Sequence, residues 1–478
     1  MITGRCVFRS ALCAFMVCLA AGNAVAAAAE RPDIVVFLTD DQSQTDLTPY
    51  GGDEFRTPNM QQLAESGMTF TSAYVASPTC APSRGALLTG LMPARNGAEP
   101  NHAKPRAEIK KWPAYFQELG YEVVAFGKVS HYRHTAGYGF DYFAYDTFHD
   151  HRGIAAAVEF LQERASRVTR RPLCLMVGSN WPHVPWPEKD SSYDPGKLPL
   201  PVTSVDTPET RQWRARYAAA VTKADDDLGT IRAAASSFLG RNVIFLFSGD
   251  NGTQWPFAKW NCYEAGVRVP LIVSWPDRVK PGARTDAVVS WVDYLPTLLE
   301  AAGGKPPRDI DGKSFLRVLR GKSSAHRKEV FTTHAGDGNW NIYPIRSLRI
   351  GGWKYIRNLR PDLAFTTHID LAGNLGQRDY FSTWEEAAKT QPAAATTVTR
   401  YHARPAEELY HLETDAAEQK NLAADPRYSS RLKEMRRKVD KWMRSQGDTG
   451  RIYGEPRPLS DPDSFGPNAP SGDARRKK

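Results

Sequence analysis

The chain has 478 residues, which exceeds the size of one ordinary hydrophobic core and predicts two domains. Apolar residues make up 41% and charged residues 24%, with 36 Gly and 34 Pro, a composition that excludes a disordered, collagenous or coiled-coil protein. Beyond residue 30 no apolar run approaches the ~20 residues needed to cross a bilayer, which excludes a polytopic membrane protein. The formal charge is +9, from 62 basic and 53 acidic side chains.

The first 26 residues have the pattern of a secretory signal peptide. Arg5 and Arg9 form a basic segment, an apolar run follows from Ala11 to Ala21, and Ala24 and Ala26 supply the small residues of a cleavage site. A membrane anchor or a buried helix is the alternative, but the run is shorter than a membrane span. We therefore expect cleavage after Ala26 and an exported protein, periplasmic or secreted, without stable membrane insertion. Loss of the two arginines lowers the formal charge from +9 to +7.

Three cysteines remain after this cleavage, namely Cys80, Cys174 and Cys262. Three is too few for a disulfide framework, although one pair could form in an oxidising compartment. At least one cysteine therefore needs another explanation, and Cys80 is the candidate.

Short apolar runs rich in β-forming residues recur through the first two thirds of the chain. Their apolarity is continuous rather than alternating, which predicts strands covered on both faces, as in a mainly parallel sheet flanked by helices. Thr57, Pro58 and a closing Gly67 mark one helix over Met60–Ser66. We expect an α/β layer architecture. The predicted strands are Asp33–Thr39, Glu122–Phe126, Leu173–Val177, Asn242–Phe247 and Leu271–Trp275.

From about His334 the pattern changes to that of a smaller C-terminal α+β domain with an antiparallel sheet. The runs Ile345–Ile350 and Trp353–Ile356 flank a two-glycine turn and predict a hairpin, and a long helix is predicted from Arg427 to Ser445. Residues 451–478 hold five prolines and end in four basic residues, which predicts a disordered tail. The expected organisation is a signal peptide (1–26), a large α/β domain carrying the candidate site (30–335), the smaller domain (336–450) and the tail (451–478).

Polar groups follow four of the predicted strands directly. Open α/β sheets bind their ligands beyond the carboxyl ends of strands, so we expect these groups to lie close together and to form an active site. They are Asp40-Asp41, Gly127-Lys128, Gly178 to His183, and Asp250-Asn251. Three carboxylates and an amide oxygen are hard ligands that suit Ca²⁺ or Mg²⁺. The sequence therefore predicts a metal site at Asp40, Asp41, Asp250 and Asn251.

The run Cys80-Ala81-Pro82-Ser83-Arg84, followed by Gly85 to Gly90, matches the C-x-P-S-R signature of type I sulfatases, and the chain resembles that family. The resemblance implies an alkaline-phosphatase-like fold. It also implies that a formylglycine-generating maturation enzyme oxidises Cys80 to formylglycine, whose hydrated aldehyde is the nucleophile. Ca²⁺, rather than Mg²⁺, would touch this residue and a sulfate oxygen, which adds Cys80 to the metal site.

The chemistry of sulfate ester hydrolysis accounts for the other residue types in this pattern. The substrate is a permanent anion, and attack at sulfur moves further charge onto the leaving atom, so the site needs positive charge and a proton donor. Cys80 precedes a helix and lies in its positive field, while Arg84, about one turn later, can steady the hydroxyls of the nucleophile. Lys128 can bond a sulfate oxygen as a compact cation.

Three further residues match positions of the family. His131 follows Lys128 by three residues, a spacing similar to that of iduronate-2-sulfatase, and it or a neighbouring histidine would contact the formylglycine. His183 matches the histidine that contacts sulfate and protonates the leaving group. Lys259 resembles a late lysine that assists leaving-group departure. Sulfamidases favour arginine at this position, which counts against a strict N-sulfatase.

The C-terminal region resembles a subgroup of the family, the heparan N-sulfatases (sulfamidases) and related bacterial glycan sulfatases. Together the two resemblances cover nearly all of Arg31 to Asp448. His102 and His334 lie in positions from which they could reach the sugar of the substrate. The C-terminal runs that carry the resemblance are Tyr343–Arg349, Glu408–Leu412 and Gln419–Pro426.

These observations predict a sulfatase that acts on a sulfated saccharide, with the sulfate either N- or O-linked. A charge of +7 is compatible with a polyanionic substrate, and equally with a role in solubility. One alternative is a phosphonate or phosphate ester hydrolase of the same superfamily. The other is a non-catalytic polysaccharide-binding relative, which the presence of every expected catalytic residue type disfavours. A nucleic-acid partner is not expected, because only the charge and the basic tail favour it.

Overall fold

The computed structural model describes residues 31–145, 152–371, 376–466 and 469–472, so the predicted signal peptide lies outside the described residues. The described residues from 31 onward belong to one compact unit and form two sheets. Within the described ranges, no helix combines the length and the apolarity that crossing a membrane requires.

In the described part of the chain the larger sheet has nine strands, in the order β4-β3-β5-β1-β6-β7-β2-β8, with β9 paired to β2. Neighbouring strands from β4 to β6 are parallel, whereas β7 is antiparallel to both β6 and β2. The expectation of a mixed, mainly parallel sheet is confirmed. The bounds are β1 Asp33–Thr39, β2 Met68–Tyr74, β3 Glu122–Gly127, β4 Tyr142–Ala144, β5 Leu173–Gly178, β6 Val243–Gly249, β7 Arg268–Ser274, β8 Ala283–Thr285 and β9 Val289–Ser290.

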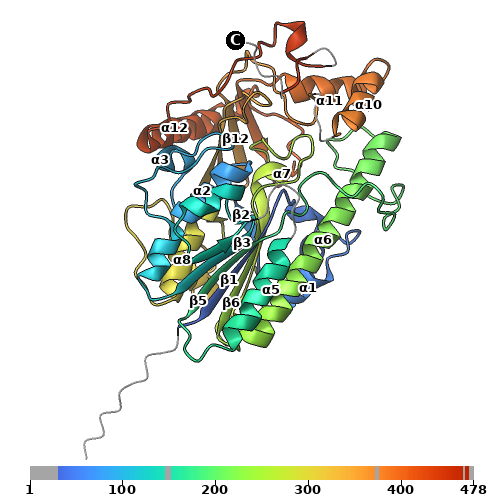
Figure 1. Cartoon of the computed structure of the whole chain (residues 1–478). Helices are drawn as coiled ribbons and strands as arrows, with labels where there is room; N and C mark the ends of the chain where they lie inside the picture. Colours follow the sequence, from blue (N-terminus) through green and yellow to red (C-terminus); the bar gives the residue numbers. More distant parts are fainter. Residues whose placement is uncertain (1–30, 146–151, 372–375, 467–468, 473–478) are drawn as a thin grey trace, which may run out of the picture. The chain divides into compact units, whose positions relative to one another are not determined.

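Helices cover both faces of this sheet, as Figure 1 shows. Alternate residues of β1 point to opposite faces, so Val35 and Phe37 enter one core while Ile34, Val36 and Leu38 enter the other. This double burial is why the strand is apolar without interruption. The first core is closed by α1 (Pro58–Ser66), α5 (Arg152–Ala165) and α6 (Pro208–Phe238), and the second by α2 (Cys80–Thr89), α4 (Trp112–Gln117) and α8 (Tyr294–Ala301).

The smaller sheet is antiparallel, with the order β10-β11-β12-β13, and contains the predicted hairpin. One face packs Leu348, Tyr355 and Leu409 against α12, while Ile345 and Ile356 on the other face join the core of the larger sheet. The second sheet is thus a layer on the larger one. The strands are β10 Glu329–His334, β11 Ile345–Ile350, β12 Trp353–Asn358 and β13 Glu407–His411; the remaining helices are α3 Pro93–Asn96, α7 Glu264–Val267, α9 Leu316–Leu319, α10 Arg378–Ala388, α11 Pro392–His402 and α12 Ser429–Gln446.

The described part of the C-terminal segment is hydrogen-bonded to the rest of the chain, whereas its composition predicts a disordered tail. The backbone N–H of Ala364 donates to Arg457 O at 2.8 Å, and that of Leu459 donates to Asp362 O at 2.8 Å. The hydroxyl of Tyr453 donates to Glu99 at 2.9 Å. Backbone pairing of this kind needs no apolar composition, which is why the proline-rich sequence gives no sign of it.

Candidate active site

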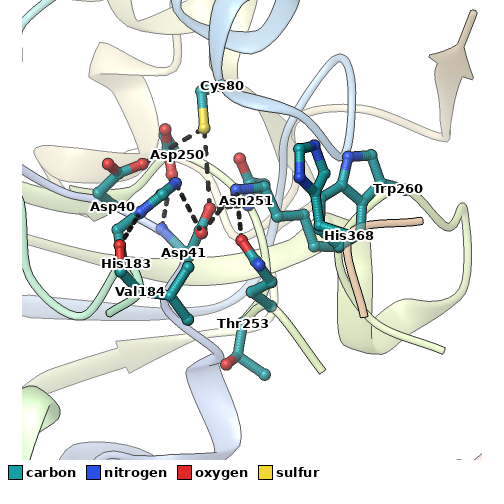
Figure 2. Close-up of polar contacts among 12 residues, drawn as sticks. Asp40, Asp41, Cys80, His183, Val184, Asp250, Asn251, Thr253, Trp260 and His368 are labelled. Atoms are coloured by element: carbon teal, nitrogen blue, oxygen red, sulfur yellow. Dashed lines mark hydrogen bonds and ion pairs between the residues drawn. The ribbon is translucent and has the colours of Figure 1, made fainter. Parts of the chain in front are cut away.

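The acidic residues that follow β1 and β6 meet at one edge of the larger sheet. The two strands are parallel neighbours in which Thr39 pairs with Gly249, so the residues after them lie side by side. Asp41 has a φ of 63°, a left-handed conformation that aspartate tolerates better than most residues, and its N–H donates to Asp250 Oδ1 at 3.0 Å. Asn251 Nδ2 donates to Asp41 Oδ1 at 2.8 Å. Figure 2 shows these side chains converging below Cys80.

Cys80 is the first residue of α2, and its side chain points into this acidic cluster. The Sγ atom lies 3.4 Å from Asp40 Oδ1, 3.7 Å from Asp41 Oδ1 and 3.8 Å from Lys128 Nζ. Burial and the nearby charge of Asp40 raise the pKa of the thiol well above its usual value. Beside these carboxylates, Cys80 is therefore a protonated thiol and a weak nucleophile as it stands.

Three buried cations balance the three carboxylates. Arg84 Nε donates to Asp250 Oδ2 at 2.7 Å, Lys128 Nζ is paired with Asp40, and Lys259 Nζ lies 2.6 Å from Asp41 Oδ2. Burial opposes the charge on Lys259, yet the charge of Asp41 raises the pKa of this lysine above its usual value. Buried charges are stable only when they are paired with opposite charges, as they are here. A substrate anion would therefore bind to cations that the carboxylates already hold in place.

A glycine at the end of β5 allows the backbone of Lys128 to pass close by. Lys128 N donates to Gly178 O at 2.9 Å, and a Cβ added at Gly178 would lie 2.0 Å from Lys128 O. We expect Gly178→Ala to force the two strand ends apart and to lower the free energy of unfolding by about 1–3 kcal/mol. Denaturant unfolding measures this loss. Gly137→Ala is the matched control, because an added Cβ there meets no atom within 4 Å; equal stability of the two variants would contradict the prediction.

The acidic cluster fits a hard divalent cation. Ligand atoms of Asp40, Asp41, Cys80 and Asp250 all lie within 4.8 Å of one another. Asn251 Oδ1 is buried and has no hydrogen-bond partner among the described residues, which leaves one oxygen for a ligand. Burial raises the pKa of Asp250 to about 7, and the charges of Asp40 and Asp41 act in the same direction. Carboxylate and amide oxygens gathered in this way are typical ligands of Ca²⁺ and Mg²⁺.

His183 reaches the cluster from the loop after β5. Its Nδ1 lies 2.6 Å from Val184 O, an atom that only accepts, so Nδ1 carries a proton. Its Nε2 lies 3.5 Å from Asp41 Oδ2 and is the nitrogen turned toward the cluster. Burial, followed by the charge of Lys259, lowers the pKa of His183 to about 4.

Above the cluster lies a cavity of about 510 Å³. Of the sequence-predicted residues, Cys80, His102, His131, His183 and Lys259 line it, whereas Asp40, Asp41, Arg84, Lys128, Asp250 and Asn251 are fully buried around Cys80 and are not among the lining residues. The sequence gives no signal for several other lining residues, because they come from loops far apart in the chain. These are Asn101, Tyr132, Arg133, His134, Gln254, Trp260, Asp337, Trp340 and His368.

The structure does not bring His334 to this cavity. The residue ends β10, is fully buried, and its Nε2 lies 2.7 Å from Asn341 Oδ1. The direction of a strand-end side chain depends on pairing register, which the local sequence does not reveal. Cys80, Cys174 and Cys262 are all free and buried, so no disulfide joins the described cysteines.

Comparisons with known proteins agree with this geometry. The sulfatase family model matches residues 32–304, and the model described as "N-sulphoglucosamine sulphohydrolase, C-terminal" matches residues 252–370. An ulvan-active sulfatase of Formosa agariphila is 31% identical over 431 residues, which cover 88% of this chain and 82% of that protein. The human N-sulphoglucosamine sulphohydrolase is 25% identical over 466 residues, covering 86% of this chain and 90% of that protein.

Comparison with solved structures also finds sulfatases. A solved structure described as a 2-O GAG sulfatase superposes with a TM-score of 0.66 at 22% identity, covering 89% of this chain and 95% of that one. The alkaline-phosphatase-like architecture is thus confirmed. The chain belongs to the sulfatase family and is a sulfuric ester hydrolase.

Proposed function

We propose that this enzyme removes sulfate from a sulfated saccharide, as an ester or a sulfamate, with a formylglycine made from Cys80 as nucleophile. The observation that carries the proposal is the position of Cys80 at the first turn of α2, among three carboxylates and two lysines at the base of the cavity. A cavity of about 510 Å³ is within the range of ligand sites for sugar-sized molecules. The relatives named for ulvan and for N-sulphoglucosamine support a saccharide.

The residues of the cluster have different roles in the reaction. Asp40, Asp41, Asp250 and Asn251 would hold Ca²⁺, which supplies positive charge to a sulfate oxygen when bound. Formylglycine at position 80 supplies a hydrated aldehyde in place of the inert thiol. Cys80 stands at the positive end of the α2 dipole, which favours negative charge at this position.

The remaining side chains bind charge and move protons. Arg84 is fixed by Asp250 and holds the nucleophile end of α2 in place. Lys128 lies beside Cys80, Lys259 is paired with the neighbouring Asp41, and both lysines bind sulfate oxygens. His183 Nε2 gives a proton to the leaving oxygen or nitrogen, and His131, which also lines the cavity, takes one from the nucleophile. The low pKa of His183 describes the protein without substrate, and a bound sulfate anion would raise it.

The experiment that tests the proposal is sulfate release from a panel of defined saccharides. Protein co-produced with the maturation enzyme is offered N-sulfated, O-sulfated, phosphorylated and unmodified forms of one sugar scaffold. Sulfate release from at least one sulfated form, with little phosphate release, is expected. Faster phosphate release would favour a phosphate or phosphonate ester hydrolase, and tight binding without any release would favour a non-catalytic saccharide-binding protein.

The metal site gives a prediction with a readout other than activity. Asp41→Asn keeps the shape of the side chain but removes one charge, so we expect Ca²⁺ affinity to fall about 10–100-fold. Because the pKa of Asp250 is about 7, a proton competes with the cation, and the affinity of the unaltered protein should fall as pH decreases below 7. Calorimetry with CaCl₂ measures both effects. The control is Asp225→Asn, which changes a buried carboxylate that caps α1. If Asp41→Asn bound Ca²⁺ as tightly as the unaltered protein, the assignment of the acidic cluster as the metal site would be wrong.

A further inference from the structure

One buried carboxylate, outside the acidic cluster, gathers polar groups from three distant parts of the cavity wall. Asp337 follows β10 and is 1% exposed. Its Oδ2 accepts from Asn101 Nδ2 at 3.0 Å and from Trp260 Nε1 at 2.7 Å, and lies 3.6 Å from His368 Nε2. Its Oδ1 lies 3.1 Å from His102 Nε2. Burial alone would raise the pKa of Asp337, but the nearby rings of His102 and His368 hold it well below its usual value, and Asn101 and Trp260 donate to it, so the group is a carboxylate.

The carboxylate sets the protonation pattern of two histidine rings in series. Asp337 has no proton to donate, so the nearby Nε2 of His102 carries one and its Nδ1 is an acceptor when the ring is neutral. That Nδ1 lies 2.7 Å from His131 Nε2, which must then be the donor. The proton of the neutral His131 ring is thereby placed on Nε2. Its Nδ1 is left as an unprotonated base, buried and without a partner among the described residues.

The same carboxylate also reaches the start of the helix that carries Cys80. Asn101 donates to Asp337 through Nδ2 and accepts through Oδ1 from the backbone N–H of Ala81 at 3.1 Å. The backbone N–H of Asn101 donates to Gly336 O at 2.9 Å, so two bonds tie this loop to the segment after β10. Asp337 is therefore connected through Asn101 to the backbone next to Cys80, and through His102 to His131, which lines the same cavity as Cys80.

We propose that Asp337 is a positioning residue for sulfate hydrolysis, which acts through His102 to keep His131 Nδ1 unprotonated, so that it can accept a proton from the nucleophile. This inference rests on the proposed function, since it assigns His131 the task of accepting a proton from a hydroxyl of the formylglycine. The proton moves from that oxygen to His131 Nδ1, and the His131 ring becomes an imidazolium. The charge of Asp337, transmitted by His102, stabilises this cation, and Asp337 itself stays ionised.

The first test is Asp337→Asn, which keeps the size of the side chain. An amide can donate to His102, which permits the reversed tautomer in both rings and places a proton on His131 Nδ1. We expect kcat to fall about 10²-fold while KM changes little, because a wrong tautomer disables the base without removing substrate contacts. Asp293→Asn is the matched control: Asp293 is an equally buried carboxylate that binds Arg327 and His326, away from the cavity. It should lose stability and keep wild-type kinetics.

The pH dependence of kcat/KM distinguishes a positioning role of Asp337 from a purely structural one. Loss of the Asp337 charge makes the imidazolium form of His131 less favourable, so the acidic limb of kcat/KM should move to lower pH. A general loss of stability would leave that limb where it is. The titratable and charged groups that face His131 are Asp40, His102, Lys128, Tyr132 and His134, and all of them remain in this variant.

The second test removes the intermediate ring and supplies it again from solution. His102 has a φ of 67° and its side chain is 60% exposed, so His102→Gly suits the backbone and opens a site for a small molecule. We expect a loss in kcat similar to that of Asp337→Asn, and partial recovery on adding imidazole. The double variant of His102→Gly with Asp337→Asn should show no recovery, because the added ring then lacks its acceptor.

A third measurement does not depend on activity. NMR of the histidine ring nitrogens, assigned with His102→Gly and His131→Gln, should show His131 protonated on Nε2 and not on Nδ1. The proposal is overturned if Nδ1 carries the proton, or if both single variants keep wild-type kcat and pH profile. Absence of sulfate release by the wild-type protein would instead refute the proposed function, and the NMR result would still decide the arrangement of the two rings.

Discussion

Replacing Cys80 with serine is expected to lower kcat by about 10⁴-fold or more, which would place the nucleophile at the start of α2. Serine is nearly isosteric and leaves the surrounding carboxylates and lysines unchanged. It has one hydroxyl, however, whereas a hydrated aldehyde has two, and the second is needed to expel sulfate and regenerate the aldehyde. The variant should therefore complete at most one turnover, and steady-state sulfate release measures the loss.

Cys262→Ser is the matched control for this substitution. Cys262 is also buried and free, and Thr332 and Ser347 beside it offer hydrogen bonds that a serine hydroxyl can use. We expect this control to keep wild-type turnover. Peptide mass spectrometry of the active wild-type protein should show formylglycine at position 80. A fully active preparation that contains only the free thiol would contradict the assignment, as would an active Cys80→Ser variant.

The parts of the fold that the sequence predicts are those in which burial alone fixes the residue types. Strand β1 is covered on both faces, and so its residues are apolar without a break. The same argument locates β3, β5 and β6 to within one or two residues. It does not give direction: the apolar run of β7 resembles the others, yet this strand is antiparallel to its neighbours. Continuous burial selects composition, whereas direction depends on the connections between strands.

The residues of the site also fall into those that the sequence predicts and those that it does not. Residues directly after parallel strands could be placed together in advance, because neighbouring strands deliver their ends to one edge, as Asp40 and Asp250 show. Asp337 and His368 could not, since they come from irregular segments after β10 and β12. Only the packing of the second sheet against the first brings them to the cavity. The residues at the base of the site can therefore be predicted from the ends of the strands in the sequence. The residues of the wall that faces the sugar cannot, because long-range packing brings them there.

This division also separates two kinds of functional residue. Groups at the base, such as Lys128 and Lys259, contact charges that every sulfate carries, and they are fully paired with carboxylates in the folded chain. Groups on the wall, such as Trp340 and His368, line the cavity and stack on one another with ring centres 4.1 Å apart. Changes at the base should affect all substrates, and changes at the wall should affect the choice among them.

Substitution of His183 and of Lys128 should separate proton transfer from anion binding. If His183 protonates the leaving group, His183→Ala should lower kcat/KM about 10²–10⁴-fold for a sulfated saccharide and much less for an activated aryl sulfate. An activated phenolate departs without a proton, whereas a sugar alkoxide or amine does not. Lys128 binds the sulfate itself, which every substrate shares, so Lys128→Ala should lower kcat/KM by a similar factor, about 10²–10³-fold, for all of them.

The deciding measurement is kcat/KM for the wild type and both variants across substituted phenyl sulfates and one sulfated saccharide. Plotted against leaving-group pKa, the logarithm of kcat/KM should fall more steeply for His183→Ala than for the wild type. The line for Lys128→Ala should be displaced but parallel to that of the wild type. The geometry agrees with this division, because His183 turns Nε2 toward the cavity while Lys128 lies beneath Cys80 and is fully buried. A parallel line for His183→Ala and a steeper one for Lys128→Ala would show that the two roles are reversed.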